Sequence, residues 1–149
     1  MVSSSVVVSI KRPLADVFAF VANAETAPQW RPEIAEVQRT TAAPIGVGTT
    51  YQARRRHLNE WRSARVEILE YDPLTTVVFE SSVGLDRVRE SYTFLLVAGS
   101  TRVTCAFAVT ERARSSRFAF NAEAAALSRL KDILETPGPA RRPGPAREL

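Results

Sequence analysis

Two oppositely charged residues interrupt the apolar faces of two segments in which apolar and polar residues alternate. In residues 49–57 the more apolar alternate set includes Arg55, and in residues 87–97 it includes Glu90. Because successive side chains of a strand point to opposite faces, both charges are predicted to face the interior. A buried charge is costly unless it is paired, so the pattern predicts an internal ion pair or a polar anchor for a ligand.

This pair suggests a specific chemistry. In a functional interpretation, Arg55 orients an oxygen-rich ligand, and Glu90, with a pKa raised by burial, serves as a general acid or base. Tyr92 lies on the same predicted face as Glu90 and is a further candidate for moving protons. In the alternative, strand ends or a bulge place one or both charges in solvent, or the two charges merely satisfy each other. The sequence leaves both interpretations open.

Aromatic and aliphatic side chains on the predicted inner faces are the candidates for contact with a ligand. Trp30 follows a segment that would cap the interior, where packing is its main expected role and ligand contact the alternative. The complete set of candidate ligand-binding residues is Trp30, Tyr51, Arg55, Phe79, Glu90, Tyr92, Phe94, Phe107, Phe120 and Leu127.

The chain has one histidine and one cysteine. His57 lies beside a predicted turn, which favours a solvent-exposed side chain over a general base. Without a second histidine or a clustered set of carboxylates, we predict no metal site. Cys105 lies in an apolar strand and is expected to be a buried, inert thiol. Arg54 and Arg56 are expected on the solvent face, although an arginine triplet at a cavity rim could also attract an anionic ligand or a carrier protein.

A long amphipathic segment at residues 116–135 must help to position these side chains. Its apolar residues recur at steps of three and four, which predicts a helix with one apolar face. Such a helix is marginal alone and needs a broad apolar partner. A run of short alternating strands is the candidate partner. The predicted apolar face comprises Phe120, Ala124, Leu127, Leu130 and Leu134.

The remaining elements follow from periodicity and turn residues. A helix is predicted to begin at Pro13, where a missing N–H costs nothing, and a further helical turn fits between Pro28 and Pro32. One strand precedes these helices and six follow them, which gives an α+β domain. The predicted strands are residues 4–11, 34–41, 49–57, 62–71, 75–82, 87–97 and 102–111.

Composition limits the class of protein. With 149 residues, 45% of them hydrophobic, the chain fits one domain at residues 1–135, followed by a Pro-, Gly- and Arg-rich tail at 136–149 that is expected to be disordered. The net charge of +4 is carried partly by that tail, so nucleic-acid binding is not predicted. No secretion signal or long apolar run is found, which predicts a cytoplasmic protein without stable membrane insertion. No motif for a cofactor is present, and the oligomeric state stays undetermined.

Several short segments, in this order, resemble the START-like or SRPBCC helix-grip superfamily and, within it, the polyketide cyclase/dehydrase-like branch. The resemblance implies a curved, seven-stranded antiparallel sheet around a long C-terminal helix, with two short helices between the first and second strands and an apolar cavity inside. The resembling segments are PLADVFAFVANAETAPQW at 13–30, GVGTTY at 46–51, EYDPLTTVVFE at 70–80, SYTF with GSTRVT at 91–104, and LSRLKDILE at 127–135.

The resemblance implies binding of a small hydrophobic ligand, such as a polyketide, a lipid or an aromatic metabolite. One alternative is a cyclase or dehydratase that acts in the same cavity, with Glu90, Tyr92 and Arg55 as its catalytic residues. Another alternative is a self-resistance protein that sequesters a toxic metabolite. The sequence determines neither the ligand nor whether a reaction takes place.

Overall fold

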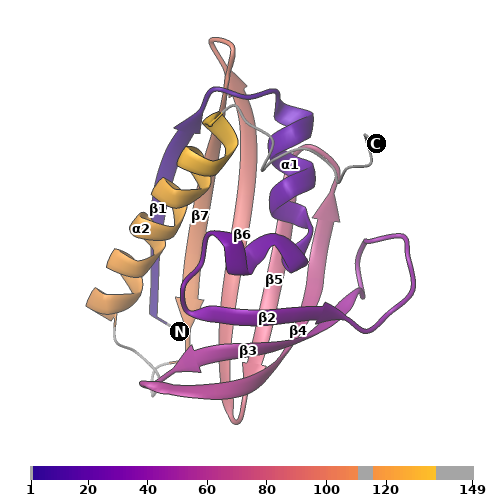
Figure 1. Ribbon diagram of the computed structural model, residues 1–149, viewed down its shortest axis with the longest axis vertical. Coiled ribbons are helices and arrows are strands. Elements are labelled where there is room, and N and C mark those ends of the chain that lie inside the picture. The colour runs from indigo at the N-terminus through magenta and orange to yellow at the C-terminus, as the bar shows by residue number, and fades with distance from the viewer. Residues whose placement is uncertain (1, 111–115, 137–149) are drawn as a thin grey trace.

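The computed structural model shows one antiparallel sheet and two helical regions that cover its concave side (Figure 1). The structure describes the backbone of residues 2–110 and 116–136, and the side chains within 4–110 and 122–136. The elements are β1 (Val2–Ile10), α1 (Leu14–Ala22), the 3-10 helix η1 (Ala24–Gln29), β2 (Ile34–Arg39), β3 (Thr50–His57), β4 (Glu60–Asp72), β5 (Thr76–Val83), β6 (Asp86–Val97), β7 (Ser100–Val109) and α2 (Ser116–Glu135).

The seven strands pair in the order β1-β7-β6-β5-β4-β3-β2, and every pairing is antiparallel. The chain thus runs as a meander from β2 to β7, and β1 joins the free edge of β7. The predicted α+β helix-grip architecture is confirmed, including the two short helices between β1 and β2. The predicted tail at residues 136–149 lies almost wholly outside the described residues and stays a prediction.

Helix α1 begins directly after Pro13, as the sequence predicts. Val17, Phe18 and Val21 form its buried face, and the ring of Phe18 packs edge-on against Phe94 of β6 at 5.0 Å between centroids. Aromatic pairs favour this geometry because the positive ring edge meets the negative ring face. Helix α1 therefore closes one end of the sheet.

Helix α2 lies along β1 and β7 (Figure 1). Leu127, Leu130 and Leu134 are buried, and their burial provides the stability that the isolated helix would lack. The C-terminal end of α2 is also held by hydrogen bonds: Arg12 Nη1 donates to the carbonyl of Leu134 at 2.8 Å. Among the described residues, no helix is long and apolar enough to cross a membrane.

Candidate functional site: a buried ion-pair network beside a small cavity

A tight turn between η1 and β2 carries the first two charged residues of the site. The N–H of Ile34 donates to the carbonyl of Arg31 at 3.1 Å, which closes a turn with Pro32 and Glu33 at its centre. Proline favours this position because its fixed φ suits the second residue of a β-turn. The turn brings Arg31 Nη1 within 3.0 Å of Glu33 Oε2.

Arg31 joins this turn to the sheet and to α2. Its side chain is only 1% exposed, and its two terminal nitrogens donate to the two carboxylate oxygens of Glu123 at 2.8 Å each. Glu90 of β6 approaches the same guanidinium at 3.6 Å. Such bidentate, charge-assisted bonds are among the strongest hydrogen bonds in proteins. Arg31 therefore links three elements that are distant in sequence.

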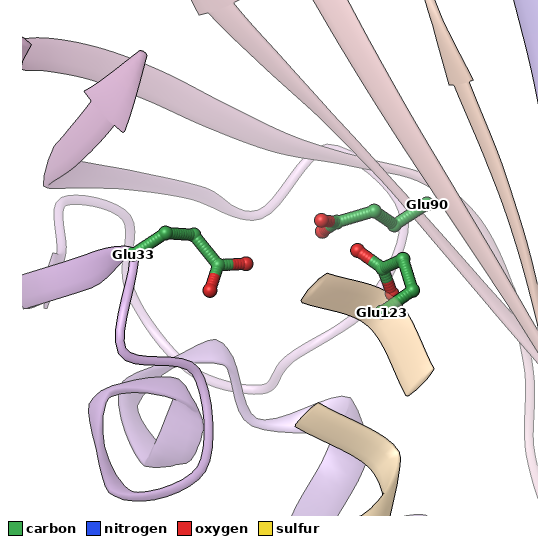
Figure 2. Close-up of side chains that lie close together, drawn as sticks. All are labelled: Glu33, Glu90 and Glu123. Carbon is green, nitrogen blue, oxygen red and sulfur yellow. The ribbon is translucent and has the colours of Figure 1, made fainter. Parts of the chain in front are cut away.

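Figure 2 shows that the carboxylates of Glu33, Glu90 and Glu123 converge, from the turn before β2, from β6 and from α2, respectively. One oxygen of each carboxylate lies within 4.8 Å of the others, a grouping that resembles a cation site. However, Arg31 Nη1 lies 3.0, 3.6 and 2.8 Å from oxygens of Glu33, Glu90 and Glu123, respectively. The guanidinium occupies the place that a metal ion would take, so the arrangement favours an ion-pair network over a metal centre.

A second arginine extends this network across the sheet. Arg55 of β3 and Glu90 of β6 are each 5% exposed, and Arg55 Nη2 donates to Glu90 Oε2 at 3.2 Å. Arg55 Nη1 also contacts Ser81 Oγ of β5 at 3.5 Å. Among the residues that the structure describes, these two bonds leave part of the donor capacity of Arg55 unused, because a guanidinium carries more N–H groups than they require. The structure thus places both charges singled out in the sequence inside, and in contact.

The network keeps its members charged. Burial by itself raises the pKa of Glu90, but Arg31 and Arg55 outweigh burial and hold that pKa below its ordinary value. This result is opposite to the raised pKa expected from the sequence, because Arg31 was not foreseen as a second positive neighbour. Burial opposes the charge of both arginines, yet the adjacent Glu90 raises the pKa of each. Glu90 is therefore an anion at neutral pH and a poor proton donor.

The neutral side chains of Tyr92 and Cys105 also contact the network. The hydroxyl of Tyr92 accepts a hydrogen bond from Arg31 Nη2, and the thiol of Cys105 donates to Glu123 Oε1 at 3.2 Å. Burial raises the pKa of Tyr92 and of Cys105 well above their ordinary values. Both groups stay protonated at neutral pH, and Cys105 is the buried free thiol that the sequence predicts.

A small cavity lies between the η1–β2 region and the inner faces of β3 to β6. Its walls are mainly apolar, and its polar side is formed by Arg31, Arg55, Ser81 and Glu90. Its volume is about 30 Å³, which is room for about two water molecules. The cavity is much smaller than the roughly 300–1,000 Å³ of pockets that hold drug-sized ligands. The interior is therefore nearly filled by side chains in this conformation.

Half of the candidate ligand-binding residues meet at this cavity. Trp30 directly follows η1, and the others belong to β3, β5 and β6. The structure thus brings together side chains that the sequence places on four separate elements. The candidates that line the cavity are Trp30, Arg55, Phe79, Glu90 and Tyr92.

The other candidates lie elsewhere. Tyr51, Phe94 and Leu127 are buried in the main core, and Phe107 belongs to a separate cluster with Val88 and Val109. The side chain of Phe120 lies outside the described residues. For all ten, a role in binding stays a prediction.

Sequence reasoning missed Arg31, Glu33 and Glu123. Glu123 stands four residues before Leu127 and is 1% exposed, whereas Ala124, predicted on the apolar face, is exposed. In the alanine-rich stretch of α2, the apolar face of the helix can be drawn through position 123 or through position 124. Nothing in the sequence therefore singled out Glu123 as a buried residue. The sequence signal for burial of Arg31 was weak: Arg31 directly follows Trp30, which was expected to pack beneath the helical segment that caps the interior.

The expectation for His57 was wrong. His57 is buried, and its Nε2 lies 3.0 Å from Asp86 Oδ2 of β6, while Thr110 Oγ1 donates to Asp86 Oδ1 at 3.0 Å. The β3–β4 hairpin curls far enough that the last residue of β3 reaches the first residue of β6. A turn position predicts exposure only when the sheet is flat, which this sheet is not.

The fold and the site together define a helix-grip domain with a small internal cavity and a charged network at one side of it. Residues 1–135 match the family described as polyketide cyclase/dehydrase and lipid transport, and the chain belongs to this family. The resemblance seen in the sequence is thereby confirmed. None of the curated proteins compared with the chain matches it.

Solved structures with the same fold come from varied organisms. TTHA0849 from Thermus thermophilus is 15% identical with a TM-score of 0.73, and 89% of this chain and 96% of that protein are covered. The ginseng major latex-like protein 151 from Panax ginseng is 12% identical with a TM-score of 0.68 and coverages of 90% and 99%. The di-domain ARO/CYC StfQ of the steffimycin biosynthetic pathway is 14% identical with a TM-score of 0.68, over 89% of this chain and 44% of StfQ. At these identities the likeness concerns the fold.

Proposed function

We propose that this protein binds a small, largely apolar ligand that carries one neutral polar group, in the cavity beside Arg55 and Glu90. The observation that supports this proposal is the contact of these two opposite charges on an otherwise apolar wall. Ligand sites commonly combine an apolar lining with a few polar groups that fix orientation. The description of the family, with polyketides and lipids in it, supports a ligand of that general class.

The charge balance of the network indicates why the polar group should be neutral. Three carboxylates, of Glu33, Glu90 and Glu123, face two guanidiniums, of Arg31 and Arg55, so an anionic ligand would add a further negative charge to a buried, net negative cluster. A hydroxyl group suits the site better. The hydroxyl oxygen can accept a hydrogen bond from an N–H of Arg55, and the hydroxyl can donate a hydrogen bond to the carboxylate of Glu90.

The ligand cannot fit without a conformational change, because the cavity holds about 30 Å³. The segment from Ala24 to Val37 contributes a wall of the cavity. Its backbone pairs with the sheet through β2, the edge strand, and its Arg31 side chain also contacts Glu90 and Tyr92 of β6, so these contacts must break when the segment moves outward. We infer that outward movement of this segment admits the ligand. Edge elements are drawn from the less stable parts of a fold, which is where such movements occur.

A matched pair of ligands tests the charge argument. 2-Naphthol and 2-naphthoate share one aromatic skeleton, but at neutral pH the first is neutral and the second is an anion. Calorimetric titration should give tighter binding of 2-naphthol. Equal affinity for both, or tighter binding of 2-naphthoate, would contradict the proposal.

A matched pair of variants tests the location. Ala53→Val adds volume at the cavity wall, and Ala35→Val makes the same change at an exposed position of β2. We expect Ala53→Val to weaken 2-naphthol binding about ten-fold, in line with typical costs of overpacking. Ala35→Val should leave binding unchanged. Urea denaturation of both variants separates a loss of binding from a loss of folding.

A second pair uses neighbouring arginines of one strand. Arg55→Gln removes the proposed hydrogen-bond donor inside, and Arg56→Gln removes an arginine that is exposed on the opposite face. The first should weaken 2-naphthol binding about five-fold, the value of one hydrogen bond. If both changes weaken binding equally, the polar side of the cavity does not orient the ligand.

The alternative of a cyclase or dehydratase has less support, because the lowered pKa of Glu90 makes it a weak base and the raised pKa of Tyr92 makes it a weak acid. Glu90→Gln separates the two functions. In a binding protein the change leaves ligand affinity within a few fold, whereas in an enzyme it removes most turnover of a poly-β-ketone substrate. For a sequestering protein, mass spectrometry under native conditions of protein taken from its source organism would reveal the retained metabolite.

A further inference from the structure

The tips of two hairpins lie next to each other at one end of the sheet (Figure 1). Large apolar side chains are exposed at both tips. The β3–β4 turn contains Leu58, 50% exposed, and the β5–β6 turn contains Leu85, 80% exposed. Arg62 connects the two tips: a Cβ added to Gly84 would lie 3.1 Å from Arg62 Nη2. The apolar side chains of both tips therefore belong to one end of the molecule.

An aromatic ring between two cations extends this end onto the outer face of the sheet. Trp61 is 39% exposed, and the guanidinium carbons of Arg54 and Arg56 lie 5.3 and 5.9 Å from its ring centroid. Cation–π contacts of this kind hold the two charges beside an accessible indole. We call this surface the tip face. It comprises Arg54, Arg56, Leu58, Trp61, Arg62 and Leu85.

The three arginines of the tip face are positive charges without a carboxylate partner within the described part of the chain. Two exposed arginines elsewhere are paired, Arg65 with Glu67 at 3.2 Å and Arg89 with Glu80 at 2.8 Å, whereas Arg102 has no carboxylate partner among the described residues. The tip face is distinguished by three such arginines close to one another. Glu60 is the acidic residue at the start of β4 and does not balance three cations. The tip face thus combines a positive charge with protruding apolar side chains.

From this combination we propose that the tip face docks peripherally on the surface of an anionic phospholipid bilayer. Leucines at hairpin tips can enter the boundary of the acyl chains, and tryptophan favours the headgroup level because its ring is apolar and its N–H is polar. Arginines bury their alkyl stems while their charges reach the lipid phosphates. An acidic protein would satisfy the arginines but would leave two protruding leucines without a groove, so the bilayer is the better fit.

The docking also has a geometric consequence. Arg55, which lines the cavity, lies in β3 directly between Arg54 and Arg56, which belong to the tip face. A docked bilayer would therefore contact the outer face of the strand whose inner face holds the polar side of the cavity. The docking inference does not depend on the proposed ligand, since Arg54, Arg56 and Trp61 lie on the other face of the sheet; Arg62 pairs with Arg55 across the strands and reaches the tip face at the end of the hairpin.

Sedimentation with vesicles tests the proposal directly. One vesicle preparation is phosphatidylcholine alone and the other contains about 30% phosphatidylserine, at about 0.1 M salt, where screening is moderate. We expect binding to the anionic vesicles only, and loss of that binding as salt is raised. Brominated phospholipids should quench the fluorescence of Trp61, since Trp30 is buried in the core.

Variants with matched controls localise the contact. Arg54→Gln with Arg56→Gln should weaken binding about thirty-fold, because each arginine near an anionic surface contributes about five-fold. Leu85→Ser should also weaken it. The controls are Leu95→Ser and Arg102→Gln, a cross-strand pair of exposed residues in β6 and β7 away from the tip face. These controls should bind normally.

Several results would overturn the proposal. They are equal binding to both vesicle preparations, no binding to either, or equal losses in the tip-face variants and the controls. Retention on an acidic protein or on nucleic acid without retention on anionic vesicles would assign the tip face to a different partner. All the substituted side chains are exposed, so circular dichroism should show unchanged folding.

Discussion

Replacing Arg31 by methionine is the most direct test of the buried network. Methionine fills much of the same volume but cannot neutralise the carboxylates around it. After the change, Glu123 loses both of its 2.8 Å bonds, and Glu90 keeps only its contact with Arg55. The result is a group of buried carboxylates with one neighbouring guanidinium in place of two.

The expected magnitude follows from what is left behind. Removing one partner of a buried ion pair costs about 3–5 kcal/mol, because the remaining charge is desolvated without compensation. For a chain of 149 residues, the usual entropy of unfolding converts this loss into a fall of roughly 10–15 °C in Tm. The further change Glu123→Met removes the stranded charge, so the double variant should recover most of the lost stability.

The assay is urea denaturation of the wild type, Arg31→Met, and the double variant as a function of pH. In Arg31→Met three carboxylates face one guanidinium, so taking up a proton relieves their mutual repulsion, and the stability of this variant should rise as pH falls from neutral toward about 5. The wild type should show no such gain. A loss below about 1 kcal/mol, or a pH dependence parallel to that of the wild type, would refute the idea that Arg31 neutralises the cluster.

Three further predictions concern other parts of the structure. The pKa of Glu90 is lower in the folded state than in the unfolded state, so the charge of Glu90 stabilises the fold above the unfolded pKa. This contribution should be lost as pH falls below about 4. Urea denaturation at acid pH would measure the loss, and constant stability there would contradict the prediction. Cys105 is buried with a raised pKa, so a thiol reagent should label it only at the rate of unfolding, and rapid labelling of native protein would disagree. Asp86→Ala should destabilise the protein by about 2–4 kcal/mol by removing the partner of His57, whereas Glu36→Ala at an exposed position should have almost no effect.

Much of the fold could be predicted because the sequence carries strong periodic signals. The alternation in β3 and β6 correctly assigned Arg55 and Glu90 to the inner surface and Arg54 and Arg56 to the outer one. The stripe of leucines in α2 and the proline before α1 located both helices. These signals are local, and each depends only on the period of one element.

The site could be predicted only in part because its centre is not periodic. Arg31 lies in a turn, where neither a period of two nor one of 3.6 applies, and Glu123 lies in an alanine-rich stretch that fits two alignments of its helix. The pKa of Glu90 was misjudged for the same reason, since its direction depends on a residue that lies 59 positions away in the chain. The error for His57 had a different origin: its place beside the turn was weighed above the period of two in β3, which puts His57 on the same face as Arg55.

The three consecutive arginines of β3 also protect the pairing of the sheet. If β3 slid by one residue against β4, every side chain would change faces, and Arg54 and Arg56 would enter the core while Tyr51 and Ala53 would leave it. Two unpaired guanidiniums in an apolar interior would make that alignment far less stable than the native one. The arginine triplet therefore favours the native register of the β3–β4 hairpin during folding, because it makes the register shifted by one residue less stable.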